Sequence, residues 1–226
     1  MERGTVSVGV SGDASFSVSL QLEARPVCTL ICGKSASGKS TFALRHLVNL
    51  PRGVIRFVFD PRGEYQRRLN LLAAETEEEL GFALSDGWVI YEPGAMFPGN
   101  SGQAFEWFAG WVFAQASRLP GRKVFFVDEV WKFCSRMAIP QPLAVCVQEG
   151  RKAGLEMSFA TQRPELISGA IVNERTEVVC FRLQEQISLD KAAAWGFEPA
   201  EVLALPAGAF IARNCESDAV LRGRVF

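Results

Sequence analysis

The sequence predicts an α/β fold, in which a mainly parallel sheet is flanked by helices and built around a phosphate-binding loop. A glycine-rich loop at residues 33–41 follows an apolar run at residues 27–31 and precedes a helical pattern at residues 42–48. A second apolar run ends in Asp-Glu, at residues 124–129. Apolar runs and helical patterns alternate through most of the chain, which is typical of a parallel sheet with helical crossovers.

The composition fits one domain of this class. The chain has 226 residues, of which 48% are hydrophobic and 22% are charged, so it can bury a sizeable core. Its net charge of −1 means that any contact with nucleic acid must come from a local basic patch. We expect a single domain, 1–226, with a β-hairpin at 1–24, a core at 25–212 and an edge strand in 213–226.

The cysteine pattern and the N-terminal sequence indicate whether the protein resides in a reducing or an oxidising compartment. Several of the six cysteines lie in apolar runs and none forms a C-x-x-C pair, which predicts buried thiols in a reducing compartment, although an even number would also allow disulfides. We see neither the apolar stretch of a signal peptide nor a run long enough to span a membrane. The one histidine, His46, is expected to pack or to face solvent and not to act in catalysis.

The loop at residues 33–41 matches G-x-x-x-x-G-K-[ST] in the strand–loop–helix context that this motif requires. Its glycines permit backbone angles that let loop N–H groups and a helix N-terminus converge on an anion. Lys39 is placed to reach the β- and γ-phosphates, and the Ser40 hydroxyl is placed to bind Mg²⁺. The alternative is an ordinary Gly/Ser turn. The predicted nucleotide-binding residues are Gly33, Lys34, Ser35, Ala36, Ser37, Gly38, Lys39, Ser40 and Thr41.

Polar side chains follow two further apolar runs. Asp128 is placed to bind Mg²⁺, and Glu129 beside it is a candidate general base for an attacking water. The alternative for this pair is an acidic strand end without function. A predicted strand at residues 155–160 leads to Gln162, a candidate sensor of the γ-phosphate or of the water, as a glutamine is in GTPases.

The sequence predicts a hairpin before the glycine-rich loop and a strand after the helix that follows the loop. Period-two alternation at residues 5–10 and 16–22, around a turn composition, predicts a hairpin beside the core. A strand at residues 54–59 leads to Asp60, which precedes a proline and is read first as a turn-forming residue.

Helical patterns fill the middle of the chain. A short acidic helix at residues 76–84 has Thr76 and Glu79 as a capping box. The helix at residues 103–119 is apolar on several sides, which fits either a subunit contact or burial within one protomer. The remaining expected elements are a strand at 88–91, a helix at 142–152, a strand at 178–183, helices at 188–195 and 199–205, and edge strands at 209–212 and 220–225.

Taken together, these motifs resemble the HerA/FtsK superfamily of ring-forming, DNA-pumping ATPases over residues 25–212. The matches are the loop at 33–41, the element at 60–65, the strand at 124–129, and Gly-Arg-Lys-Ala-Gly-Leu at 150–155 running into Ala-Thr-Gln-Arg-Pro at 160–164. The resemblance implies a RecA-like (additional-strand) P-loop NTPase core, with the sensor strand between the two motif strands. It also implies a homo-oligomeric ring, usually a hexamer, around duplex DNA.

The same resemblance implies roles for individual residues. Lys39, Ser40, Asp128, Glu129 and Gln162 would act on ATP and Mg²⁺ as described above. Arg151 corresponds to the arginine that acts in the neighbouring subunit's site. The runners-up for that role are Arg163 and Arg175, and the structural alternative for Arg151 is a cation at a helix C-terminus.

Within the superfamily, the missing membrane spans, barrel and DNA-reading domain leave a minimal motor core. Such a core resembles the genome-packaging ATPases of tailless, internal-membrane-containing icosahedral viruses with double-jelly-roll capsid proteins. That implies sequence-independent binding of double-stranded DNA, a partner at the capsid vertex, and a location in the host cytoplasm and the virion. The alternatives are a motor of recombination, segregation or conjugative transfer, and a virion export ATPase.

Basic residues beyond the motif strands are the candidate DNA contacts. They are Lys132 and Arg136, or Arg62, Arg67 and Arg68. Contacts of this kind grip phosphates without reading bases, which suits a motor that moves any sequence. The alternative for each cluster is an ordinary charged surface.

Overall fold

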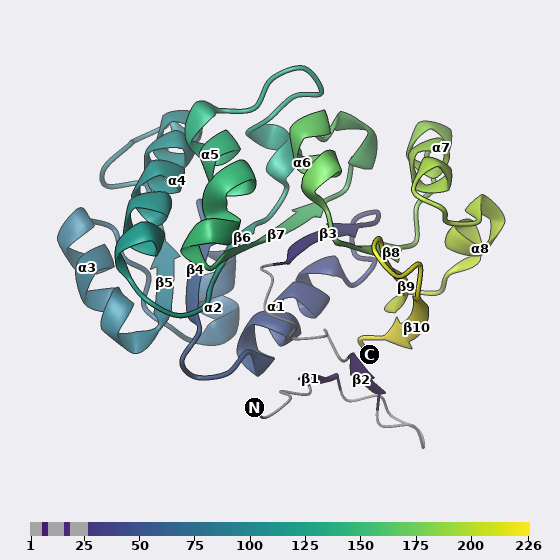
Figure 1. The fold of residues 1–226 in the computed structure, drawn as a ribbon, viewed down its shortest axis with the longest axis horizontal. Coiled ribbons are helices and arrows are strands. Elements are labelled where there is room, and N and C mark those ends of the chain that lie inside the picture. The colour runs from purple at the N-terminus through teal and green to yellow at the C-terminus, as the bar shows by residue number, and fades with distance from the viewer. Residues whose placement is uncertain (1–5, 9–15, 19–26) are drawn as a thin grey trace.

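An eight-stranded β-sheet forms the centre of the chain in the computed structural model, which describes residues 6–8, 16–18 and 27–226 (Figure 1). Its strands are β3 (Cys28–Cys32), β4 (Ile55–Phe59), β5 (Trp88–Tyr91), β6 (Lys123–Val127), β7 (Leu155–Thr161), β8 (Glu177–Phe181), β9 (Ala209–Asn214) and β10 (Val220–Arg224). They lie in the order β10-β9-β8-β3-β7-β6-β4-β5. The strands from β3 to β8 are mutually parallel, which confirms the predicted fold class.

The strand order matches the expected core in one respect and differs in another. β7 lies between β3 and β6, so the strand leading to Gln162 does separate the two motif strands. β9 runs antiparallel between β8 and β10, so the expectation that it is an edge strand was wrong. The reason is its burial, because Phe210 and Ile211 are both buried and belong to hydrophobic clusters on opposite faces of the sheet.

Helices cover both faces of this sheet. They are α1 (Lys39–Asn49), α2 (Glu64–Leu69), α3 (Glu77–Asp86), α4 (Ser101–Arg118), α5 (Gln141–Glu149), α6 (Gly169–Glu174), α7 (Gln186–Ala194) and α8 (Pro199–Ala204). The sequence did not predict the six-residue helices α2 and α6. At the start of α3 the Thr76 side chain accepts from the Glu79 N–H, as in a capping box, but the Glu79 carboxylate accepts from the Glu75 N–H rather than from that of Thr76.

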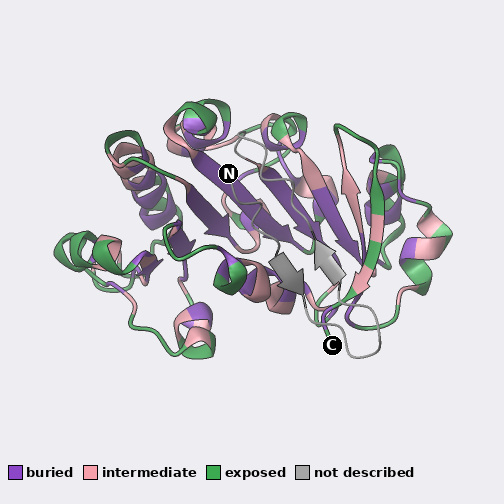
Figure 2. Cartoon of the chain, turned by 60° about the horizontal axis from the view of Figure 1, so that its bottom comes forward, coloured by how far each residue is buried: buried purple, intermediate pink, exposed green. Residues whose placement is uncertain are grey.

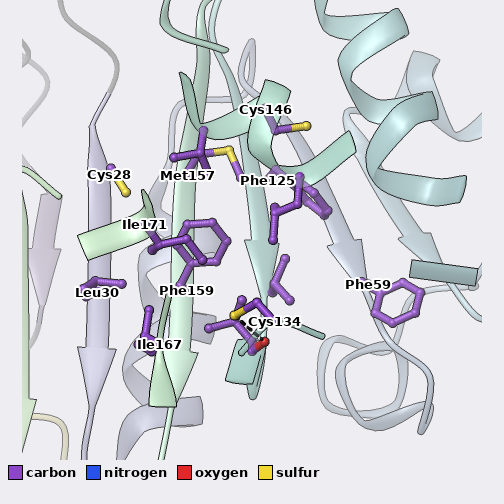
Figure 3. Packing of buried hydrophobic residues seen from close by; sticks show 14 of the residues in the cluster. Cys28, Leu30, Phe59, Phe125, Cys134, Cys146, Met157, Phe159, Ile167 and Ile171 are labelled. Atoms are coloured by element: carbon purple, nitrogen blue, oxygen red, sulfur yellow. Dashed lines mark hydrogen bonds between the residues drawn. The ribbon is translucent and has the colours of Figure 1, made fainter. Parts of the chain in front are cut away.

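Successive residues of the parallel strands enter two different hydrophobic clusters, as the period of a strand requires. The larger cluster includes Leu30, Phe125 and Phe159 and packs under α4, α5 and α6. Figure 3 shows part of it, with Ile171 of α6 beside these strand residues. The smaller cluster takes the next residue of each strand and packs under α1. The strands are therefore buried on both faces, while the outer sides of the helices are exposed (Figure 2).

The aromatic side chains of α4 find their partners inside the chain. Phe108 is fully buried, and the half-buried rings of Trp107 and Trp111 lie 5.7 and 6.0 Å from those of Tyr91 and Phe57. The other side of α4 packs against α5. Contacts within the protomer therefore cover much of the apolar surface of this helix.

Outside this sheet, β1 (Val6–Val8) and β2 (Phe16–Val18) pair in an antiparallel manner, with Val6 opposite Val18. They form a separate two-stranded sheet, and the turn expected between them lies outside the described residues. All six cysteines are free thiols, and all but Cys215 are buried. In the part of the chain that the structure describes, no helix has the length and apolarity needed to cross a membrane.

Candidate nucleotide site

The loop between β3 and α1 has the backbone geometry of a phosphate-binding loop. Gly33 and Gly38 have φ angles of 156° and 114°, and Gly38 directly precedes α1. A Cβ atom at Gly33 would lie 2.5 Å from the Phe181 Cβ, and one at Gly38 would lie 2.8 Å from a Val225 methyl group. Both positions therefore exclude a side chain. Among the residues that the structure describes, the buried Ser37 Oγ has no hydrogen-bond partner, so the loop holds a polar group that a ligand could satisfy.

A cavity of about 670 Å³ opens beside this loop, a size typical of small-ligand sites. It is lined by Ser35, Ala36, Gly38, Lys39, Ser40, Thr41, Phe59, Asp60, Pro61, Arg62, Glu64, Tyr65, Arg68, Ser101, Gly102, Asp128, Glu129, Lys132, Phe133, Gln162 and Phe226. Five residues predicted for catalysis or metal binding thus meet there, coming from α1 and from the ends of β6 and β7. Of the nine loop residues, Gly33, Lys34 and Ser37 do not line the cavity.

Lys39 lies beneath the loop. Its side chain is 5% exposed, and its ammonium donates to the Lys34 carbonyl at 3.0 Å. Burial lowers the pKa of Lys39, while the nearby carboxylates of Glu129 and Asp128 oppose that shift. Lys39 and the two acids thus line one cavity and interact electrostatically.

Asp128 is held at both carboxylate oxygens. The Tyr65 hydroxyl donates to Oδ2 at 2.7 Å, and the backbone N–H of Glu129 donates to Oδ1 at 2.9 Å. Burial raises the pKa of Asp128, and the hydrogen bond from Tyr65 counteracts this. Ser40 and Tyr65 line the same cavity as Asp128.

Glu129 takes a left-handed backbone conformation, with φ of 51°, which is uncommon for a residue other than glycine. Its Oε2 accepts from the Trp131 indole N–H at 2.5 Å and from the backbone N–H of Gln162 at 3.2 Å. Trp131 lies in the 3₁₀ turn Val130–Lys132, and the guanidinium of Arg163 lies 5.1 Å from its ring centroid. The candidate base is therefore linked directly to the end of β7.

Asp60 serves a local purpose that fits its interpretation as a turn residue. Its carboxylate, 2% exposed, accepts from the backbone N–H groups of Glu64 and Gln66, each at 2.9 Å. These are N–H groups of the first turn of α2, which have no partner within the helix. Asp60 thereby fixes the position of α2 and of Tyr65.

Arg151 lies away from the cavity of its own chain. It is exposed in the 3₁₀ turn Gly150–Ala153, just before β7 begins, whereas Gln162 follows the end of that strand. A strand of seven residues spans on the order of 20 Å, so the two ends of β7 are that far apart. Arg163 and Arg175 are likewise absent from the described residues that line the cavity, and their guanidinium groups lie over Trp131 and Trp195.

Three of the five candidate DNA contacts lie at this cavity instead of on a separate surface. Arg62, Arg68 and Lys132 line it, and Arg68 donates to the Thr41 hydroxyl at 3.2 Å and pairs with Glu64. Arg67 bonds the Gly63 and Arg62 carbonyls, and Arg136 is exposed.

Several residues that line the cavity were not among the predicted site residues, Tyr65 and Phe226 among them. Trp131, which bonds Glu129, was not predicted either. Tyr65 belongs to the element at 60–65, which is one of the matches to the superfamily. That match could have indicated Tyr65 as a site residue. Trp131 and Phe226 have no comparable motif in the sequence.

No protein-family model and no curated protein matches this sequence. The fold is similar to that of the genome packaging NTPase B204 from Sulfolobus turreted icosahedral virus 2 in complex with ATP-gammaS, with a TM-score of 0.70 and 15% identity over 91% of this chain and 100% of that chain. It is also similar to the plasmid coupling protein TrwB in complex with ADP and Mg²⁺, with a TM-score of 0.65 and 13% identity over 90% of this chain and 86% of that chain. The chain therefore shares the fold of these two proteins, which is the RecA-like P-loop NTPase fold that the sequence predicted.

Proposed function

We propose that this chain is an ATP-hydrolysing motor that moves double-stranded DNA into a preformed viral capsid. One observation carries the proposal. Lys39, Ser40, Asp128, Glu129 and Gln162 converge on one cavity, next to a loop shaped for phosphate, in a fold shared with a genome packaging NTPase.

Each side chain has a chemical part in this proposal. The loop N–H groups and Lys39 bind the phosphates of ATP. Ser40 and Asp128 fit Mg²⁺, which in such sites takes one or two protein oxygens together with phosphate oxygens and neutralises phosphate charge. Glu129 accepts the proton of the attacking water, and Gln162 orients that water or contacts the γ-phosphate.

The position of Arg151 favours a site completed by a second copy of the chain. It lies at the opposite end of β7 from the cavity, so it cannot reach the nucleotide bound to its own subunit. In a ring, which we take to be a hexamer, it would point into the neighbouring site and stabilise the charge of the transition state. Arginine fingers of this kind accelerate hydrolysis by about 10³–10⁵.

The proposed partners are double-stranded DNA, bound without sequence preference, and proteins of a capsid vertex. Location in the host cytoplasm during assembly and in the virion is part of the same proposal. Because Arg62, Arg68 and Lys132 line the nucleotide cavity, exposed Arg136 is the first of the candidate DNA contacts to test.

The test is the ATPase rate measured with and without duplex DNA over a series of salt concentrations. We expect DNA to stimulate hydrolysis and the stimulation to fall as salt rises, since phosphate contacts release counterions. Sequence-scrambled duplexes should stimulate equally. A rate that is indifferent to duplex DNA at low salt would count against a translocase while leaving the ATPase in place.

A second candidate is a motor of conjugative transfer, recombination or segregation, because the coupling protein TrwB has a similar fold. A virion export ATPase is the third. The chemistry in the cavity would be the same, so the genes beside this one separate the candidates. Capsid-protein genes favour packaging, and genes for a nuclease, a relaxase or a mating pore favour the second candidate.

A further inference from the structure

Tyr65 contacts Asp128, one of the two side chains proposed to hold Mg²⁺. Its hydroxyl donates to Asp128 Oδ2 at 2.7 Å, and it lines the same cavity as Ser40, the other proposed ligand. Tyr65 lies in α2 and Asp128 directly follows β6, so this bond joins two elements that are 63 residues apart in the sequence.

Tyr65 is itself held firmly. Its ring is 2% exposed and lies edge-on to Phe126, with the centroids 5.1 Å apart. The N–H groups on either side of it, those of Glu64 and Gln66, both donate to the carboxylate of Asp60. Asp60 therefore fixes the start of α2, and α2 in turn fixes the position of the Tyr65 hydroxyl.

Two donors then determine the orientation of the Asp128 carboxylate. Oδ1 accepts from the Glu129 N–H, and Oδ2 accepts from Tyr65. Each carboxylate oxygen has a second lone pair, so both donors leave a position for a metal ion. Removing a residue that orients a metal ligand in this way typically costs 10- to 100-fold in metal affinity.

We propose that Tyr65 is a positioning residue for Mg²⁺, which acts by orienting the carboxylate of Asp128. The inference rests on the proposed hydrolysis of ATP in this cavity. It gives the element at 60–65 a function that depends on its tyrosine hydroxyl.

The chain supplies a matched control, because it has two tyrosines. Tyr91 is also fully buried among aromatic rings, and its hydroxyl contacts only the Met96 sulfur, at 3.6 Å, among the hydrogen bonds described. We expect Tyr65→Phe to raise the Mg²⁺ concentration for half-maximal ATPase activity about tenfold, with kcat at saturating Mg²⁺ within about threefold of wild type. Tyr91→Phe should leave the Mg²⁺ dependence unchanged.

A measurement without turnover separates this inference from the proposed function. Electron paramagnetic resonance of free Mn²⁺, titrated into the ADP complex, should show about tenfold weaker Mn²⁺ binding in Tyr65→Phe than in Tyr91→Phe. Equal affinities, or tighter binding in Tyr65→Phe, would overturn the role of Tyr65 even if the wild type hydrolyses ATP. A wild type that binds Mn²⁺-ADP without hydrolysing ATP would overturn the function and not this inference.

A readout on the unsubstituted chain covers the case in which Tyr65→Phe does not fold. Labelling with 3-fluorotyrosine gives two ¹⁹F resonances, and the one missing from Tyr91→Phe is that of Tyr91. Mg²⁺ added to the ADP complex should shift the Tyr65 resonance and leave that of Tyr91 in place. No shift of the Tyr65 resonance would contradict the proposal.

Discussion

The Trp131 indole N–H donates to Glu129 Oε2 at 2.5 Å, and the same oxygen accepts from the backbone N–H of Gln162. The first donor comes from the 3₁₀ turn after β6 and the second from the end of β7. The carboxylate proposed as the general base is therefore oriented by two neighbouring strand ends. None of the hydrogen bonds described involves its other oxygen, Oε1, so in the proposed mechanism that oxygen would accept the proton of the water.

The first prediction concerns this orienting bond. Trp131→Phe keeps an aromatic ring under the Arg163 guanidinium but removes the N–H donor to Glu129. We expect kcat to fall about tenfold with the KM for ATP unchanged, because a well-placed base is worth about 10²–10⁴ in rate and here it loses one of two orienting bonds. Steady-state ATPase kinetics measure both constants.

Trp195→Phe is the control for the first prediction. Trp195 likewise has cationic side chains over its ring, but it is buried among the C-terminal helices and does not line the cavity. Its substitution should leave kcat unchanged. A kcat for Trp131→Phe equal to or above wild type would show that the indole does not orient the base.

The second prediction tests the base itself. Glu129→Gln keeps the shape of the side chain and an oxygen that can accept from Trp131, but it removes the group that accepts a proton. Nucleotide affinity, measured by fluorescence titration, should stay within about threefold of wild type, while turnover falls by at least about 10². Glu106→Gln, on the exposed side of α4, is the matched control. Ordinary turnover in Glu129→Gln would remove the assignment.

The third prediction tests whether Arg151 acts across a subunit boundary. Arg151→Ala and Lys39→Ala should each be inactive alone, since one lacks the cation supplied to the neighbour and the other lacks the cation beneath its own loop. A mixture should recover part of the activity, because some interfaces pair an intact loop with an intact Arg151. Activity is measured over a range of mixing ratios, with differently labelled chains to show that mixed rings form. Mixed rings without activity at any ratio would favour a structural Arg151.

The candidate site residues that could be predicted from the sequence are those that lie in contiguous motifs. Gly33, Gly38, Lys39 and Ser40 were predictable because the loop geometry, the phosphate contact and the start of α1 lie within nine residues. Alternating runs of apolar residues were enough to predict the parallel strands. That Gln162 lies near Asp128 depends on β7 lying between β3 and β6, and only the family resemblance supplied that order.

The contacts between side chains that are distant in the sequence could not be predicted from contiguous motifs. Tyr65 and Asp128 are 63 residues apart, and their hydrogen bond exists because α2 packs across the smaller hydrophobic cluster toward β6. The link from Trp131 to Glu129 depends on the left-handed backbone of Glu129, for which a glutamate gives no local signal. The position of β9 in the sheet was predicted wrongly, because a short apolar strand has the same sequence pattern at the edge of a sheet as in its interior.

The fourth prediction concerns His46, the one histidine of the chain, which lies in the last turn of α1. Burial, followed by the positive charges of Arg122 and Arg56, lowers the pKa of His46 from 6.5 to about 4. The imidazole is therefore neutral in the folded protein across the range in which it becomes charged in the unfolded chain. The C2–H proton resonance of tag-free protein should titrate near pH 4, and a midpoint near 6.5 would contradict the structure.

This shift has a consequence for stability. Between pH 6.5 and about 4 the unfolded chain binds a proton at His46 that the folded chain does not, so the free energy of unfolding contributed by His46 is present above pH 6.5 and is lost as pH falls through this window. Glu177 acts in the opposite sense, since burial raises its pKa to about 7, and the pH dependence of the wild type alone is therefore a sum. The difference between wild type and His46→Gln isolates the histidine. Urea unfolding at pH 7 and pH 4.5 should show the wild type losing about 2 kcal/mol more than the variant, and an equal loss would mean that His46 is charged in the fold.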